Sequence, residues 1–118
     1  MNTGFKRSDR VAHSIEKEVS QMIVKGEIKD PRLSSVFITG IKITDNLSLA
    51  EIFFTVIEGV GDREEALKGL QSAKGFLKGK LAKNLKMRRI PELRFSYDSA
   101  LEKGYKVDDI LREIDSEK

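Results

Sequence analysis

Apolar residues near the N-terminus follow the period of an α-helix. From Val11 to Ile23, the valine, isoleucine and methionine side chains fall on one helical stripe, which predicts one buried helical face. Ser8 is the predicted N-cap of this helix, and Gly26 follows as its predicted C-cap. Residues 1–7 are expected to form a flexible tail ahead of the helix.

The next part of the chain changes to the period of β-strands. A proline-containing turn at residues 30–32 ends the helical pattern. Residues 36–44 are rich in β-branched side chains, and residues 49–57 place apolar side chains at alternate positions, so both predict strands. Turn-forming residues 45–48 join them into a hairpin, and Gly40 inside the first strand indicates a β-bulge.

Helical spacing returns after the hairpin. Asp62, with Glu65 three residues later, is typical of a helix start, and leucines then recur every fourth residue from Leu77 to Leu85. Gly75 separates two apolar stretches, and glycine weakens a helix by about 1 kcal/mol relative to alanine. With Ser72 just before it, we expect a kink or short break there rather than one straight helix.

The remaining residues predict one more strand and one more helix. Pro91 ends the second helix, and residues 93–97 alternate as a third strand. Residues 107–114 have the apolar spacing of a short helix, and residues 115–118 are expected to be a flexible end. The order α-β-β-α-kink-α-β-α predicts an α+β fold, one domain over residues 1–118, with helices packed on one face of a three-stranded sheet.

Charge is distributed very unevenly along the chain. Residues 72–94 hold eight basic residues and a single acid, Glu92, out of 22 basic and 19 acidic residues in all, so this stretch carries +7 and the remainder −4. A solvated surface is the commoner explanation of a charged run, but solvated faces mix both signs. We therefore favour a surface that binds a polyanion.

Two further features, one inside this stretch and one at the start of the first helix, allow two explanations each. A helix that begins near Gly75 would point free backbone N–H groups outward, which suits a phosphate. Small Ala73 and Gly75 equally allow two helices to pack tightly, and these two explanations are compatible. Arg7 and Arg10 oppose the dipole at the start of the first helix, so they serve a partner or have no role.

Composition argues against an enzyme. There is no cysteine, and the single histidine, His13, lies on the predicted solvent side of its helix, so we expect no catalytic residues, no metal and no cofactor. No apolar run is long enough to cross a membrane and no signal peptide fits, which favours a cytoplasmic location without a membrane partner. Only Phe76 and Phe95 lie in or beside the basic stretch to stack on bases, so RNA recognised by shape and backbone is favoured.

Short motifs over nearly the whole chain resemble the bacterial ribosome-binding factor A family. The most specific block begins with Ser72-Ala73-Lys74-Gly75-Phe76-Leu77 and ends with Pro91-Glu92-Leu93-Arg94-Phe95. Between these two lie Leu81-Ala82 and Leu85-Lys86-Met87-Arg88, and Asp98 follows them. The other matching motifs are Arg7-Ser8-Asp9-Arg10-Val11, Asp30-Pro31-Arg32, Leu47-Ser48 and Leu101-Glu102-Lys103-Gly104. The chain departs from the family at Lys78, where arginine is common, at Gly79, and at Asn46, where aspartate is frequent.

The resemblance implies a KH-like (type II) fold in which Ser72 and Ala73-x-Gly75 form a kink in place of the usual GxxG loop. It also implies a monomeric, non-enzymatic assembly factor that binds free 30S subunits through 16S ribosomal RNA. Such a factor assists late maturation, including processing of the 16S RNA 5′ end, has a role in cold adaptation, and is released by a ribosome-associated GTPase. The alternative is a generic single-stranded RNA-binding KH-type module without ribosome specificity.

The residues expected to contact RNA are all basic, and Ser72, Ala73 and Gly75 are expected to shape the backbone beside them. They are Lys74, Lys78, Lys80, Lys83, Lys86, Arg88, Arg89, Arg94, Arg7 and Arg10.

Overall fold

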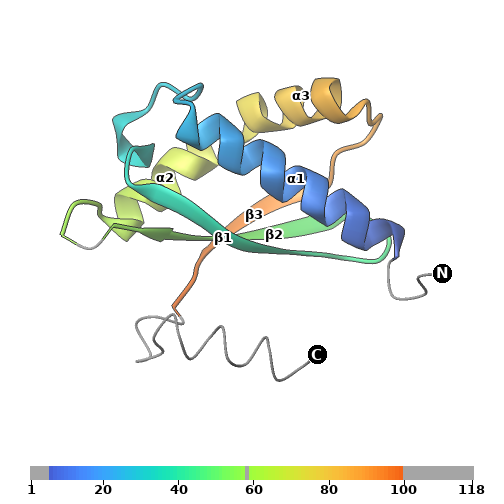
Figure 1. The fold of residues 1–118 in the computed structure, drawn as a ribbon, viewed down its shortest axis with the longest axis horizontal. Helices are drawn as coiled ribbons and strands as arrows, with labels where there is room; N and C mark the ends of the chain where they lie inside the picture. The colour runs from blue at the N-terminus through green and yellow to red at the C-terminus, as the bar shows by residue number, and fades with distance from the viewer. Residues whose placement is uncertain (1–5, 58, 100–118) are drawn as a thin grey trace.

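The computed structural model describes residues 6–57 and 59–99, and within them three α-helices cover one face of a three-stranded sheet (Figure 1). In chain order the elements are α1 (Arg7–Val24), the 3-10 turn η1 (Pro31–Leu33), β1 (Val36–Ile43), β2 (Leu49–Val56), α2 (Arg63–Ser72), α3 (Lys74–Leu85) and β3 (Glu92–Tyr97). The α+β prediction is therefore confirmed. The helix predicted at residues 107–114 and the end at 115–118 lie outside the described residues.

The sheet has the order β1-β2-β3, which the sequence did not reveal. β1 pairs antiparallel with β2 through the short hairpin turn, whereas β2 pairs parallel with β3. A parallel pair needs a long crossover connection, and α2 and α3 supply it. The two helices between the second and third strands thus explain why this sheet is mixed.

The predicted β-bulge in the first strand is confirmed. Ile38 pairs with Phe54 and Gly40 pairs with Phe53, so Thr39 is an extra residue without a partner across the ladder. The Thr39 hydroxyl instead donates to a carboxylate oxygen of Asp98 at 2.7 Å. The bulge therefore redirects a side chain of β1 toward the residue that follows β3.

The core lies between the sheet and the helices. Alternate residues of β2 and β3 are buried on the face that the helices cover, as the period of two predicted. The largest side chains with almost no exposed surface are Phe54, Ile15, Met22, Ile52, Leu70, Leu77, Leu81 and Leu93. Leu77 and Leu81 of α3 are thus held by the core, which leaves the other sides of that helix to its lysines.

The two ends of α1 differ in how well they were predicted. Ser8 is not the N-cap: it lies inside the first turn and is buried, while the Lys6 N–H donates to the Asp9 carboxylate at 3.0 Å. This bond satisfies a free N–H ahead of the helix, so α1 already begins at Arg7, a residue that the prediction had placed in the tail. Residues 1–5 of the predicted tail lie outside the described residues. Gly26 does follow the C-terminus, with φ +69°.

The helix-rich crossover is interrupted at Ala73, the single residue between α2 and α3. The Ala73 N–H still bonds to the Gly69 and Leu70 carbonyls, and its own carbonyl accepts from the Leu77 N–H at 2.9 Å. The interruption thus lies two residues before Gly75, which is exposed inside α3 with open space where a Cβ would be. Whether this geometry is of the KH-like type stays a prediction.

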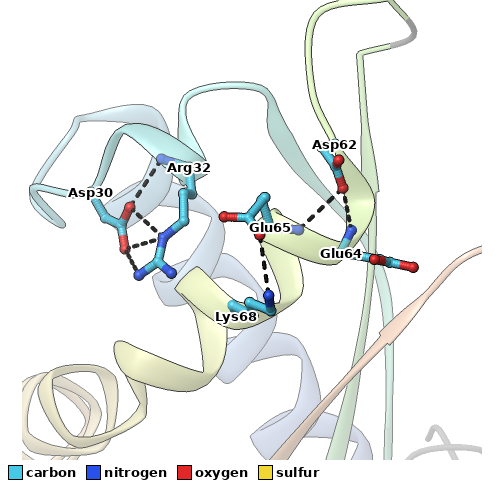
Figure 2. Close-up of polar contacts among 6 residues, drawn as sticks. All are labelled: Asp30, Arg32, Asp62, Glu64, Glu65 and Lys68. Carbon is cyan, nitrogen blue, oxygen red and sulfur yellow. Dashed lines mark hydrogen bonds and ion pairs between the residues drawn. The ribbon is translucent and has the colours of Figure 1, made fainter.

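α2 starts as predicted and packs against η1. The Asp62 carboxylate accepts from the Glu64 and Glu65 N–H groups at 2.8 and 3.2 Å, which caps the helix (Figure 2). Farther along, a Cβ on Gly69 would lie 3.0 Å from a Leu33 methyl group, so glycine permits this close approach.

The turn before β1 is closed by an ion pair. Arg32 donates to both carboxylate oxygens of Asp30, the shortest contact being 2.7 Å (Figure 2). The hydrogen bonds from the Arg32 side chain and backbone hold the pKa of the Asp30 carboxyl below its usual value of 3.8. Asp30 and Arg32 therefore stabilise the fold at the side of α2.

Candidate nucleic-acid interface

Three segments that are far apart in the sequence meet at one end of the molecule. They are the first turn of α1, the turn between β1 and β2, and the segment that follows α3 (Figure 1). The Glu92 N–H donates to the Ser48 carbonyl at 2.9 Å, which ties the last segment to the hairpin turn. Lys6 and Asp45 pair at 3.6 Å, which ties the start of α1 to the same turn.

Between these segments lies a groove of about 900 Å³, and its rim is cationic. The basic residues that line the groove are Arg7, Lys78, Lys86, Arg88 and Arg89. None of its lining residues is acidic, and the others are Asn46, Leu47, Ser48, Met87, Ile90 and Pro91. We call this surface the basic groove. Cations gathered around a concavity without acids raise the local positive potential and favour a polyanion.

A smaller hollow of about 360 Å³ continues from the basic groove along α1. Arg7 and Met87 line both concavities, and Arg10 lies in the smaller one. Arg7 and Arg10, the two arginines of the first turn of α1 that the sequence lists among the expected RNA contacts, therefore belong to the same cationic surface as the segment after α3.

Two residues that line the groove have left-handed backbones although neither is glycine. Lys86 has φ +53° at the C-terminus of α3, and Leu47 has φ +61° in the hairpin turn. The Lys86 and Met87 N–H groups both bond to the Ala82 carbonyl, which stops the helix and turns the chain toward β3. Such conformations cost of order 1–3 kcal/mol and cluster at functional sites.

Three of the predicted RNA-contacting lysines have acidic partners from other elements. Glu92 pairs with Lys74 at 3.7 Å and with Lys78 at 3.3 Å. Lys80 pairs with Glu27 at 3.9 Å, and its ammonium lies 5.7 Å from the centre of the Phe76 ring. The spacing within α3 offered no such partners, because they come from β3 and from the residues after α1.

The other predicted residues form no ion pair with any residue in the described ranges. They are Lys83, Lys86, Arg88, Arg89, Arg94, Arg7 and Arg10. Lys83 is exposed on α3, and Arg94 is exposed on β3. Neither lines the basic groove, so the structure brings together only part of the predicted set. Ser72, Ala73 and Gly75 also lie outside the groove, at the interruption between α2 and α3.

Sequence reasoning missed the uncharged part of the groove. The sequence predicts Asn46 and Ser48 only as turn residues and gives no role to Met87 and Ile90. The only available signal was the placement of Leu47-Ser48 and Met87 among or beside the quoted motifs. Charge patterning cannot find such residues, because only the folded chain shows that they lie beneath the cations.

Within residues 6–57 and 59–99, no cluster of histidine, cysteine, aspartate and glutamate could hold a metal ion. The same ranges contain no helix with the length and apolar character needed to cross a membrane. His13 is exposed, as its helical position predicted.

Comparison with known proteins assigns the family. A model of the family described as ribosome-binding factor A matches residues 7–111. The chain belongs to the ribosome-binding factor A family. A ribosome-binding factor A of Geotalea uraniireducens is 43% identical over 112 residues, which cover 95% of this chain and 91% of that protein. The ribosome-binding factor A of Geobacter sulfurreducens is 44% identical over 114 residues, covering 97% and 96%.

Solved structures of ribosome-binding factor A share the fold. The crystal structure of the Thermus thermophilus protein aligns with a TM-score of 0.70 at 22% identity, over 79% of this chain and 97% of that one. Another similar structure is a homology model of the Thermus thermophilus factor fitted into a cryo-EM map of its complex with the 30S subunit. It aligns with a TM-score of 0.57 at 25% identity, over 75% of this chain and 96% of that one.

Proposed function

We propose that this chain binds the free 30S ribosomal subunit through 16S ribosomal RNA and assists late steps of its maturation without catalysing a reaction. These steps include processing of the 16S RNA 5′ end, and the role is greatest in the cold. In this proposal the protein is a monomer in the cytoplasm, and a ribosome-associated GTPase releases it from the subunit.

The observation that carries the proposal is the basic groove. Five cations line it without any acidic lining residue, and four of them have no ion pair with the described residues. Ribosomal RNA is a polyanion whose phosphates account for much of the affinity of its protein partners. The names of the curated relatives and the 30S complex of the Thermus thermophilus factor support a ribosomal partner rather than another polyanion.

Co-sedimentation with ribosomal particles tests this function. The purified protein should travel with free 30S subunits on a gradient, and not with assembled 70S ribosomes, at moderate salt. Spread over all RNA-containing fractions would instead favour a generic single-stranded RNA-binding module. Absence from every particle fraction would contradict the proposed function.

A triple variant tests the cations directly. Lys83→Gln, Lys86→Gln and Arg88→Gln together remove three charges that have no ion pair with the described residues. Each lost phosphate contact reduces the salt dependence of log K by about 0.7–0.9, so the slope should fall by up to about 2–3 and binding should weaken more than about tenfold. The matched control is Lys17→Gln, Lys25→Gln and Lys29→Gln, three exposed lysines elsewhere that should leave binding nearly unchanged.

A further inference from the structure

We propose that the basic groove takes single-stranded RNA, with one unpaired base resting on an apolar floor and its flanking phosphates on the cationic rim. This inference rests on the RNA-binding function proposed above and specifies the class of RNA that the groove accepts. Three features of the groove carry it: the difference between rim and floor, the size of the groove, and one unused hydrogen-bond donor.

The rim and the floor of the groove have different chemistry. Arg7, Lys86, Arg88 and Arg89 are exposed, whereas Leu47, Met87 and Ile90 are only partly exposed and Pro91 is buried. An RNA duplex presents phosphates and 2′-hydroxyls on its outside and keeps its bases stacked within. A duplex would therefore contact the rim and leave the apolar floor uncovered, whereas a splayed base can enter and cover it.

The size of the groove fits this occupant. Its volume of about 900 Å³ lies within the range of roughly 300–1,000 Å³ that is usual for pockets holding small molecules. The floor has no aromatic ring, so the base would pack on aliphatic and thioether groups. The planar guanidinium groups of Arg88 and Arg89 offer additional stacking surfaces, as arginine does in other RNA-binding sites.

Asn46 provides the polar contact that an unpaired base needs. Its side-chain oxygen accepts hydrogen bonds from the Thr44 hydroxyl at 2.8 Å, the Ser48 N–H at 3.1 Å and the Ser48 hydroxyl at 2.7 Å. Its amide nitrogen donates to no residue in the described ranges, and Asn46 is one of the residues that line the groove. Because the oxygen is held by the turn, the amide nitrogen has a fixed direction, and it can donate to an acceptor on a base edge.

The walls of the groove are already joined in the protein without RNA. The Glu92 N–H to Ser48 carbonyl bond connects the hairpin turn to the segment after α3. Leu47 in the hairpin turn and Lys86 at the end of α3 both line the groove, and both have left-handed backbones. A preformed site loses less conformational entropy when a ligand binds.

The test compares two labelled RNAs with equal numbers of phosphates, a single-stranded oligouridine and a fully paired duplex, by fluorescence anisotropy. The wild-type chain should bind the single strand at least about tenfold more tightly. Met87→Ala removes part of the floor without changing charge, so it should weaken single-strand binding about three- to tenfold and alter duplex binding less than about twofold. Asn46→Asp keeps the turn acceptor but removes the donor, and it should reduce the preference for the single strand.

Equal or tighter binding of the duplex would overturn the inference, as would a Met87→Ala variant that weakens both RNAs equally or neither. The paired variant Arg88→Gln and Arg89→Gln should weaken both RNAs, and the control pair Lys25→Gln and Lys29→Gln should weaken neither. Co-sedimentation of the same preparations with 30S subunits separates the two proposals. If the duplex is preferred while 30S binding persists, only the occupant of the groove is wrong; if 30S binding is also absent, the proposed function fails too.

Discussion

Glu92 is the only acid in the basic stretch, and removing its charge should strengthen RNA binding while it weakens the fold. One carboxylate oxygen lies 3.3 Å from the Lys78 ammonium, and the other lies 3.7 Å from the Lys74 ammonium. An incoming phosphate must compete with Glu92 for both lysines. Glu92→Gln keeps the shape of the side chain and removes this competition.

The expected size follows from the exposure of these groups. The side chains of Lys74, Lys78 and Glu92 are 33%, 39% and 59% exposed, and exposed ion pairs contribute about 0.2–1 kcal/mol each. Two such pairs predict an affinity gain between about twofold and 30-fold. Loss of the Glu92 charge adds one net positive charge to this surface. Where that charge neutralises a phosphate, the slope of log K against log salt steepens by about 0.7–0.9. At about 0.1 M salt this corresponds to an affinity gain of about five- to eightfold, which lies between the twofold and 30-fold limits given by the ion pairs.

The assay is binding to purified 30S subunits, measured between about 50 and 200 mM salt, together with urea unfolding of the free protein. The free energy of unfolding should fall by about 0.4–2 kcal/mol, because the same two pairs are lost from the folded state. Glu64→Gln is the control, since it also removes one negative charge but lies in the first turn of α2, at the opposite end of the molecule from the groove (Figure 1). Unchanged or weaker binding by Glu92→Gln would refute the reasoning and show that Lys74 and Lys78 do not contact RNA.

Three further substitutions test the fold. Leu81→Ala removes a side chain with no exposed surface and should lower the free energy of unfolding by about 2–5 kcal/mol in urea titration. A loss below about 1 kcal/mol would mean that α3 is not anchored in the core. Gly26→Ala places a Cβ at φ +69° and should cost about 1 kcal/mol in the same titration; a stabilising effect would contradict the left-handed C-terminus of α1. Asp30→Asn should lower the free energy of unfolding at pH 7, because the carboxylate, with its lowered pKa, is ionised beside Arg32 at that pH. The difference in unfolding free energy from the wild type should narrow as the pH falls below 3.8, where the carboxylate becomes protonated. A difference that persists unchanged in acid would exclude this ion pair as its cause.

Most elements could be predicted from local sequence because their signals are local. β-branched side chains identified β1, the period of two identified β2 and β3 with their buried faces, and Gly40 marked the bulge beside Thr39. The start of α1 was mispredicted because serine is a common cap, whereas in the folded chain Ser8 is buried inside the first turn and the Lys6 N–H bonds to Asp9.

The ion pairs of the basic residues were beyond local reasoning. Lys74 and Lys78 sit on α3, yet their partner Glu92 starts β3, and the two elements face each other only because β3 pairs with β2. Patterning along one helix therefore counted these lysines as unpaired. Their availability to RNA is set by the fold.

The sequence alone determined that this protein has an α+β architecture and concentrates positive charge in residues 72–94, because periodicity and net charge are sums over neighbouring residues. Only the tertiary structure decided which of those charges act together. Arg7, Asn46 and Arg89 are distant in the chain. The parallel pairing of β2 with β3 brings the end of the crossover beside the hairpin turn, and the packing of α1 on β1 adds the first turn of α1 to the same groove. Contacts between distant segments depend on strand order and on which face the helices cover, and neither is encoded in any single stretch of residues.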